Sequence, residues 1–173
     1  MSISGYYGFN NAGDEALLTA ILASLYAIEP EADITVISGN PSETTTKHRV
    51  KSLFRFDAGK ILSALGRANL LISGGGSLLQ DVTSKRSLAY YLSIIALAKL
   101  RGKKVMLFAQ GIGPIRSGFM RFLTRVICRQ ADVITVRDRE SAEELVRLGL
   151  QREKIEVTAD SVLTLEPASR EAG

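Results

Sequence analysis

Residues 70–77 read Leu70-Leu71-Ile72-Ser73-Gly74-Gly75-Gly76-Ser77, an apolar run that passes directly into three consecutive glycines. The run is too short and too uniformly apolar for a surface helix, so it predicts a buried strand that ends in a glycine loop. Similar runs rich in Ile, Val and Leu occur at residues 34–37, 105–108, 133–136 and 155–157, and residues 1–4 leave room for one more short strand. We therefore expect a sheet with the strand at residues 70–72 at its centre.

Segments with helical spacing of apolar residues separate these strands, at residues 16–28, 88–100, 119–127 and 145–148. Pro30, Gly102 and Gly149 follow three of these segments and indicate where each helix ends. The alternation of strand and helix predicts right-handed crossovers and hence an α/β, Rossmann-like fold, with a mainly parallel sheet and helices on both faces. Residues 39–46 are expected to form one long loop, and residues 54–65 a short element before the central strand.

The composition is that of a globular protein. The chain has 173 residues, 46% of them hydrophobic and 23% charged, and a formal net charge of +4. These values predict one domain that buries a core, and they exclude a disordered or collagen-like chain. No apolar stretch reaches the roughly 18 residues of a membrane-spanning helix, and we expect no signal peptide after Met1. The single cysteine, Cys128, excludes an intramolecular disulfide and favours a cytoplasmic location. The mild basic excess suggests anionic ligands and does not by itself indicate nucleic acid.

Distinctive residues follow the carboxyl ends of the expected strands. They lie at residues 5–15, 73–81, 110–114 and 137–138, and at Asp160. Because ligands of open parallel sheets bind beyond the carboxyl ends of the strands, we expect these loops to form the functional site.

The first of these loops, residues 5–15, combines glycines, asparagines and aromatic residues in a way that suits a sugar ring. Asp14 and Glu15 fall in the first turn of the following helix, where two carboxylates would repel a phosphate that the helix N-terminus could otherwise bind. This favours hydroxyl groups as ligands. The alternative is that Asn11 or Asp14 only caps the helix.

The triple glycine allows backbone amides to approach a ligand closely. Its spacing differs from a dinucleotide fingerprint because Leu79 occupies the last glycine position, and the sequence contains no Walker lysine. We therefore expect neither a nicotinamide cofactor nor an ATPase. The alternative is a glycine bend that only allows close packing of strand and helix.

Two further side chains are candidates for chemistry. Arg137 follows a strand and could hold a carboxylate or phosphate in a bidentate pair, or form an ion pair with Asp138 or Glu140. His48 is the only histidine and is expected to be solvated. It therefore gives little support to a Ser-His-Asp triad and none to a multi-histidine metal site, and we expect no metal.

One helix has both an arginine stripe and an apolar stripe. Arg121, Arg125 and Arg129 recur every four residues, and the other face is formed by Phe119, Phe122, Leu123, Val126 and Ile127. We expect the apolar face to pack on the sheet. A basic amphipathic helix that lies on an anionic membrane is the alternative.

Four motifs together resemble those of the polysaccharide pyruvyl transferase family, in particular its bacterial branch that modifies cell-wall polymers. They are Gly5-Tyr6-Tyr7-Gly8-Phe9-Asn10-Asn11-Ala12-Gly13-Asp14-Glu15, Ser73-Gly74-Gly75-Gly76-Ser77-Leu78-Leu79-Gln80-Asp81, Gln110-Gly111-Ile112-Gly113-Pro114 and Val136-Arg137-Asp138. The resemblance implies transfer of pyruvate from phosphoenolpyruvate, the donor substrate, to a sugar, typically N-acetylmannosamine, as a 4,6-ketal. It implies no separate cofactor, and a two-domain arrangement like that of GT-B glycosyltransferases.

The resemblance also suggests roles for individual residues. The acceptor sugar would contact Tyr7, Phe9, Asn10 and Asn11, while Asp14 orients or deprotonates a hydroxyl and Arg137 holds the donor. The floor of the cleft would consist of Gly74, Gly75, Gly76, Ser77 and Gln110.

The resemblance further predicts how the chain is organised. Residues 1–165 would form an N-terminal acceptor-side domain and residues 166–173 a tail or the start of an interdomain linker. The C-terminal domain would be absent, so we expect the isolated chain to be inactive. A lipid-linked acceptor and peripheral contact at the inner face of the membrane stay open, as does the oligomeric state. Two alternatives are a carbohydrate-binding half-protein without catalysis and a GT-B glycosyltransferase that uses a nucleotide sugar.

Overall fold

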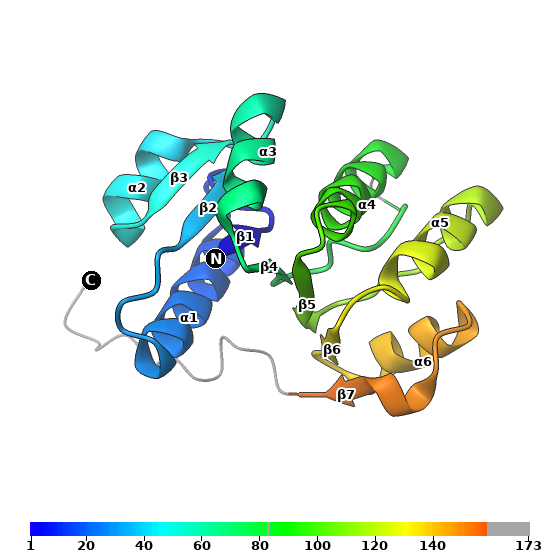
Figure 1. The fold of residues 1–173 in the computed structure, drawn as a ribbon. Coiled ribbons are helices and arrows are strands. Elements are labelled where there is room, and N and C mark those ends of the chain that lie inside the picture. Colours follow the sequence, from blue (N-terminus) through cyan, green and yellow to red (C-terminus); the bar gives the residue numbers. More distant parts are fainter. Residues whose placement is uncertain (83, 159–173) are drawn as a thin grey trace.

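The structure is a computed structural model that describes residues 1–82 and 84–158. Strands and helices alternate along these residues (Figure 1). Their bounds are β1 (Ser2–Ser4), α1 (Ala12–Ile28), β2 (Thr35–Ser38), α2 (Pro41–His48), β3 (Lys51–Phe54), α3 (Ala58–Arg67), β4 (Leu70–Gly74), α4 (Lys85–Leu100), β5 (Lys104–Gln110), α5 (Gly118–Cys128), β6 (Val133–Val136), α6 (Arg139–Arg147), the 3₁₀ turn η1 (Arg152–Lys154) and β7 (Ile155–Val157).

The described residues form a seven-stranded sheet with the order β3-β2-β1-β4-β5-β6-β7, in which every neighbouring pair is parallel. This confirms the predicted Rossmann-like α/β fold. The chain proceeds from β1 toward one edge of the sheet and from β4 toward the other. The chain segments that follow β1 and β4 therefore run toward opposite edges of the sheet and leave a crevice between their first loops, and such a reversal is where open parallel sheets bind their ligands.

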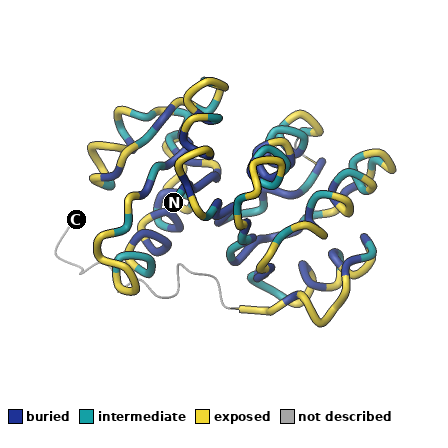
Figure 2. The backbone as a smooth tube through the Cα atoms, in the orientation of Figure 1, coloured by how far each residue is buried: buried dark blue, intermediate teal, exposed yellow. Residues whose placement is uncertain are grey.

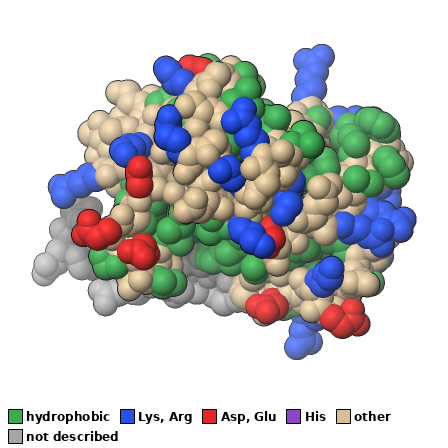
Figure 3. Space-filling view, in the orientation of Figure 1, with side chains coloured by type: hydrophobic (Ala, Val, Ile, Leu, Met, Phe, Trp, Pro, Cys, Tyr) green, Lys and Arg blue, Asp and Glu red, His purple; other side chains and the backbone are tan. Residues whose placement is uncertain are grey.

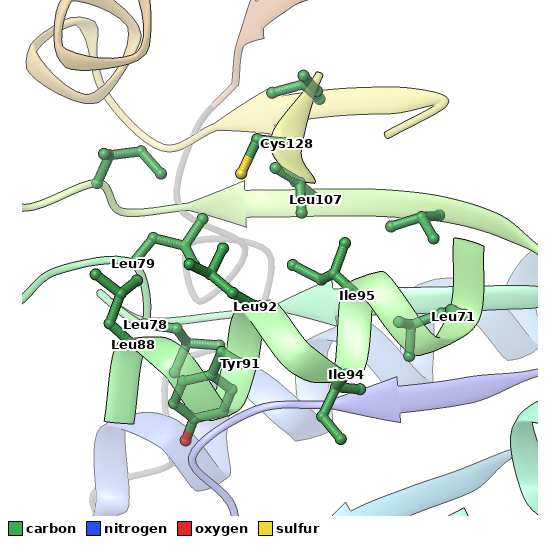
Figure 4. Close-up of a cluster of buried hydrophobic side chains, with 14 of the residues drawn as sticks. Leu71, Leu78, Leu79, Leu88, Tyr91, Leu92, Ile94, Ile95, Leu107 and Cys128 are labelled. Atoms are coloured by element: carbon green, nitrogen blue, oxygen red, sulfur yellow. The ribbon is translucent and has the colours of Figure 1, made fainter. Parts of the chain in front are cut away.

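Buried side chains form two clusters, one on each face of the sheet. Neighbouring residues of a strand point to opposite faces, so Leu71 and Leu107 belong to one cluster while Ile72 and Phe108 contact the other. The larger cluster includes side chains from α3, α4 and α6, whereas the smaller one packs against α1. Figure 4 shows the α4 side chains between the helix and the strands. Burial follows the same layering in Figure 2, where the outer helix surfaces are exposed.

One expectation for the segment before the central strand is wrong. Residues 39–46 do not form a loop, because most of them belong to helix α2. The Asn40 side chain caps this helix by accepting the Glu43 N–H and donating to the Glu43 carboxylate, and Pro41 occupies the first turn. Residues 54–65 do contain the expected short element, because helix α3 begins at Ala58; Phe54 is the last residue of β3, which pairs with β2 at the sheet edge.

The expected apolar face of α5 is only partly correct. Thr124 and Cys128 are buried, and Met120, Leu123 and Ile127 pack against the core. Three side chains that we expected on the sheet are instead 64%, 60% and 41% exposed, namely Phe119, Phe122 and Val126. The arginine stripe contacts α6 and the residues after it, since Arg121 pairs with Glu144 and Arg129 donates to the Gly149 carbonyl.

The helix ends agree with the sequence. Helix α1 ends before Pro30, and Gly102 and Gly149 have φ values of +67° and +95° after α4 and α6. None of the described helices has the length and hydrophobicity needed to cross a bilayer. Asp160 and residues 166–173 lie outside the described residues.

Candidate functional site

The triple-glycine loop after β4 needs glycine for its backbone conformation. Gly75 and Gly76 have φ values of +77° and +71°, a region that other residues rarely adopt. The Gly75 N–H donates to the Phe108 carbonyl at 3.3 Å, and the Gly76 carbonyl accepts the Gly111 N–H at 3.0 Å. These bonds tie the loop to the end of β5 and fix the position of its exposed side.

A bulge at the end of β5 places Gln110 beneath this loop. The register with β6 shifts between Leu107 and Gln110, and Ala109 has a φ of +44°. Thr135 stabilises the bulge because its hydroxyl accepts the Ala109 N–H at 2.7 Å. The fully buried Gln110 donates from Nε2 to the Gly76 carbonyl at 2.9 Å. Gln110 thus supports the glycine loop from below.

Tyr7 is a core residue. It is 1% exposed, and its hydroxyl donates to the Gly74 carbonyl at 2.7 Å. Burial raises the pKa of Tyr7 far above its ordinary value, so the hydroxyl stays protonated as a donor. The structure therefore places Tyr7 and the buried Gly74 behind the surface on which we expected them.

A pocket of about 370 Å³ opens between the loops after β1 and β4, at the reversal of strand order. It is lined by Tyr6, Asn11, Asp14, Ser77, Leu78, Gln80, Ser87 and Tyr91. Three of these residues were predicted from the sequence, namely Asn11, Asp14 and Ser77. The first loop and the glycine loop thus meet as expected.

Asp14 is the acidic side chain of this pocket. A Cβ built on Gly76 would lie 2.8 Å from Asp14 Oδ1, so the missing side chain of Gly76 makes room for the carboxylate. Burial raises the pKa of Asp14, and the charge of the neighbouring Glu15 raises it further. A carboxylate with a raised pKa is a better proton acceptor for a hydroxyl group.

The remaining residues of the first loop shape the pocket entrance. Asn11 caps α1 by accepting the Gly13 and Asp14 N–H groups, so the capping interpretation holds for Asn11. Asn10 is exposed with a φ of +57°. Phe9 is 38% exposed and stacks on Tyr6 with ring centroids 4.3 Å apart, which presents both rings beside the pocket.

Glu15 and His48 form a buried pair, which corrects the expectation that His48 is solvated. Their side chains are 8% and 4% exposed, and Glu15 Oε2 lies 2.7 Å from His48 Nε2. The other carboxylate oxygen of Glu15 accepts the Gly8 N–H at 2.9 Å. Although burial opposes ionisation, the hydrogen bonds from His48 and Gly8 lower the pKa of Glu15. The pair anchors the first loop to α1 and α2.

Arg137 lies next to the pocket and forms one of the interactions considered from the sequence, the ion pair with Asp138, together with a contact to Ser77. Its Nη2 donates to the Ser77 hydroxyl at 2.9 Å, and Nε lies 3.3 Å from Asp138 Oδ2. Gly111 accommodates the guanidinium, because a Cβ there would lie 2.9 Å from it. The ion pair with Asp138 therefore coexists with a contact to a pocket residue.

Sequence reasoning missed several pocket residues, including Tyr6, Ser87 and Tyr91. Tyr91 is on α4, which the motifs do not include. Asp81 has a structural role, since its two carboxylate oxygens accept the Arg116 and Ser117 N–H groups at 2.8 Å before α5. No group of three or more His, Cys, Asp or Glu side chains within residues 1–82 and 84–158 is placed to hold a metal ion.

Comparisons with known proteins agree with the fold and the motifs. The sequence model of the family described as polysaccharide pyruvyl transferase matches residues 11–172. No curated protein sequence matches the chain.

The fold resembles several solved structures, among them the following three. The first belongs to a protein described as a UDP-N-acetylglucosamine 2-epimerase from Listeria monocytogenes, with a TM-score of 0.55, 16% identity, and coverage of 94% of this chain and 45% of that one. UDP-GlcNAc 2-epimerase from Neisseria meningitidis, bound to UDP-GlcNAc, gives a TM-score of 0.57, 13% identity, and coverage of 94% and 47%. HepE from Anabaena, in complex with UDP and glucose, gives a TM-score of 0.55 and 11% identity, and the match covers 92% of this chain and 43% of HepE. The chain thus spans less than half the length of these GT-B-like proteins.

Proposed function

The chain belongs to the polysaccharide pyruvyl transferase family, and from this premise we propose that it forms the acceptor-side half of an enzyme that transfers pyruvate from phosphoenolpyruvate to a sugar. The acceptor we propose is an N-acetylmannosamine unit of a cell-wall polysaccharide, which receives the pyruvate as a 4,6-ketal. The observation that carries the proposal is the half-buried Asp14 carboxylate in a pocket with aromatic, amide and hydroxyl groups around it.

The chemistry requires a proton acceptor for the sugar and an anchor for the donor. A general acid protonates the methylene carbon of phosphoenolpyruvate, and a sugar hydroxyl attacks the resulting oxocarbenium-like centre. Phosphate leaves, and the second hydroxyl closes the ring. In this scheme Asp14 orients the attacking hydroxyl and takes its proton, and Arg137 binds the carboxylate or phosphate of the donor beside Ser77.

We propose two roles for the other loop residues, contact with the acceptor and support of the glycine loop. Asn10, Asn11 and Phe9 are exposed to differing degrees around the pocket and are proposed to contact the acceptor. Ser77 lines the pocket, and we propose that the glycine loop with the buried Gly75 and the partly buried Gly76 supports its floor. Tyr7 and Gln110 are proposed to hold this floor in place through their hydrogen bonds to the glycine loop.

The proposal is tested by measuring phosphate release from phosphoenolpyruvate with N-acetylmannosamine as acceptor. In the active enzyme, Asp14→Asn and Arg137→Ala should each lower turnover by about 100-fold or more. Asp33→Asn and Arg139→Ala are matched controls, because both side chains are exposed and lie outside the pocket. Unchanged turnover in both pocket variants would refute the roles of Asp14 and Arg137.

The same experiment separates the alternatives. A carbohydrate-binding half-protein would bind N-acetylmannosamine without releasing phosphate. A nucleotide-sugar enzyme is a second candidate, because two of the similar structures are described as complexes with UDP-GlcNAc or with UDP and glucose. Calorimetric titration with UDP-N-acetylglucosamine tests it, and family membership favours pyruvyl transfer.

We propose one further partner, an anionic membrane surface, for helix α5. The exposed Phe119, Phe122 and Val126 lie three and four residues apart on one face, and α5 contains arginines but no acidic residue. Figure 3 shows hydrophobic side chains gathered over α5 with basic side chains beside them. Flotation with phosphatidylglycerol vesicles at low salt should recover the chain. A Phe119→Ser/Phe122→Ser variant that floats equally well, or no flotation of the wild type, would refute this contact.

A further inference from the structure

Arg55 stands in a cage of aromatic rings at the carboxyl end of β3. Its Cζ lies 4.4 Å from the ring centroid of Tyr90, 4.9 Å from that of Phe56 and 5.2 Å from that of Phe9. A fourth ring, that of Tyr91, is 6.0 Å away. Aromatic faces attract a guanidinium, and they also replace much of the water around it. The rings thus hold a positive charge in one place after the edge strand β3, at the same end of the parallel sheet as the pocket loops.

The cage leaves this charge without an anionic partner. No carboxylate of residues 1–82 or 84–158 lies within 4 Å of the Arg55 guanidinium, whereas Arg121 and Arg137 each pair with one and Arg147 pairs with two. The Arg55 Nε atom is buried and has no hydrogen-bond partner among these described residues. Buried donors in proteins almost always have an acceptor. A guanidinium stacked on its faces still presents its N–H groups along its edges, where they fit an oxyanion.

An apolar groove of about 370 Å³ runs from Arg55 between α3 and α4. Its walls are formed mainly by Phe56, Ile61, Leu62, Ile94 and Leu97. Among the described residues that line the groove, Arg55 is the one with a charged side chain. A free sugar would not bury the apolar walls of the groove, and a hydrocarbon chain alone would leave the guanidinium without an anionic partner. The chemistry that satisfies both is an oxyanion attached to an apolar chain.

The groove lies next to the proposed acceptor pocket. Tyr91 lines that pocket and contributes to the Arg55 cage, and Phe9 stacks between Arg55 and the pocket residue Tyr6. One row of aromatic rings therefore separates the pocket from Arg55. A molecule with a sugar in the pocket could place a phosphoryl group at Arg55 by passing over these rings.

We propose that Arg55 and the groove between α3 and α4 bind a phosphoryl group that carries a hydrocarbon chain. Resting here on the proposed function, this group is the anchor that carries the acceptor sugar. Arg55 binds the phosphoryl oxygens, the groove holds the first carbons of the chain, and the sugar extends toward Asp14. The anchor site is separate from Arg137, which the proposed function assigns to the donor.

Calorimetric titration of the chain with octyl phosphate, inorganic phosphate and 1-octanol tests the site. We expect octyl phosphate to bind at least 10-fold more tightly than either of the other two. Arg55→Met should weaken octyl phosphate at least 10-fold, and the matched control Arg67→Met, at an exposed position at the end of α3, should not. The exposed Ser93 lines the groove, so Ser93→Tyr should fill it and weaken octyl phosphate without affecting inorganic phosphate.

Octyl phosphate affinity that is unchanged in Arg55→Met or in Ser93→Tyr would overturn the site, as would equal binding of 1-octanol. Flotation with phosphatidylglycerol vesicles that depends on Arg55 would overturn the acceptor-anchor part and identify a bilayer headgroup as the ligand. Phosphate release from phosphoenolpyruvate with free N-acetylmannosamine, measured in the active enzyme that contains this half, is an independent readout. If no phosphate is released but octyl phosphate binding depends on Arg55, only the proposed function is refuted. If phosphate is released but octyl phosphate binding does not depend on Arg55, only the anchor site is refuted.

Discussion

Replacing Tyr7 with Phe removes one hydrogen bond and nothing else of comparable size. The Tyr7 hydroxyl donates to the Gly74 carbonyl at 2.7 Å, and both residues are buried. The variant leaves this carbonyl without its partner, at a cost of about 1–3 kcal/mol in the free energy of unfolding. For a chain of this size, each kcal/mol lowers Tm by roughly 2–4 °C, so we expect Tm to fall by about 4–8 °C for a loss near 2 kcal/mol.

The measurement is urea and thermal unfolding followed by circular dichroism, with Tyr6→Phe as the matched control. Tyr6 is 38% exposed and lies at the pocket surface, so losing its hydroxyl should change stability by less than about 0.5 kcal/mol. Affinity for N-acetylmannosamine is measured in parallel by NMR titration. A Tyr7→Phe variant that keeps full stability but loses sugar affinity would refute the structural role and restore a direct contact with the acceptor.

Three further outcomes follow from the surroundings of individual residues. Burial opposes ionisation of Glu15, but its hydrogen bonds lower its pKa from the ordinary value of 4.5. The ionised carboxylate therefore stabilises the fold above pH 4.5, and this contribution is lost as the pH falls through the lower pKa of the folded state. The stability gap between wild type and Glu15→Gln in urea should therefore be present at pH 7 and shrink below about pH 4, and a constant gap would contradict it. Gly76→Ala and Gly102→Ala should each lose about 1 kcal/mol or more from their positive φ, but only Gly76→Ala should also reduce turnover, because its Cβ displaces Asp14 while Gly102 faces open space. Burial raises the pKa of Cys128 to about 12, so Ellman's reagent should label it at pH 8 only after unfolding in guanidinium.

Most of the strands that the sequence predicted share one property, which is burial on both faces; the exception is the edge strand β7, of which only Ile155 is buried. Runs such as residues 70–72 and 105–108 are uniformly apolar because the sheet is covered on both sides. Strand β3 is the other edge strand. Of its four residues only Leu53 is buried, so no apolar run marks it. Helix α2 had a recognisable signal in Asn40, Pro41 and Glu43, which outweighs the low helix propensity of its threonines.

Pairings between distant residues could not be predicted. His48 and Glu15 are 33 positions apart, and their contact depends on how α2 packs beside α1. Arg55 contacts rings from the first loop, the loop after β3 and α4. The rotation of α5 is a similar case, because its stripes at Met120 and Phe119 are both apolar and only the tertiary contacts decide which one is buried.

The first loop shows why positions were easier to predict than roles. Its place at the carboxyl end of β1 follows from topology alone, since every strand of the sheet is parallel. Tyr6 and Tyr7 are neighbours in a segment just after a strand, where consecutive side chains point in opposite directions. One of them must face the core and the other the solvent, and the choice depends on the register with β2 and β4. Tyr7 turns inward to Gly74 and Tyr6 lines the pocket, so the aromatic contact that we propose for the acceptor moves by one residue from the one that the motif suggested.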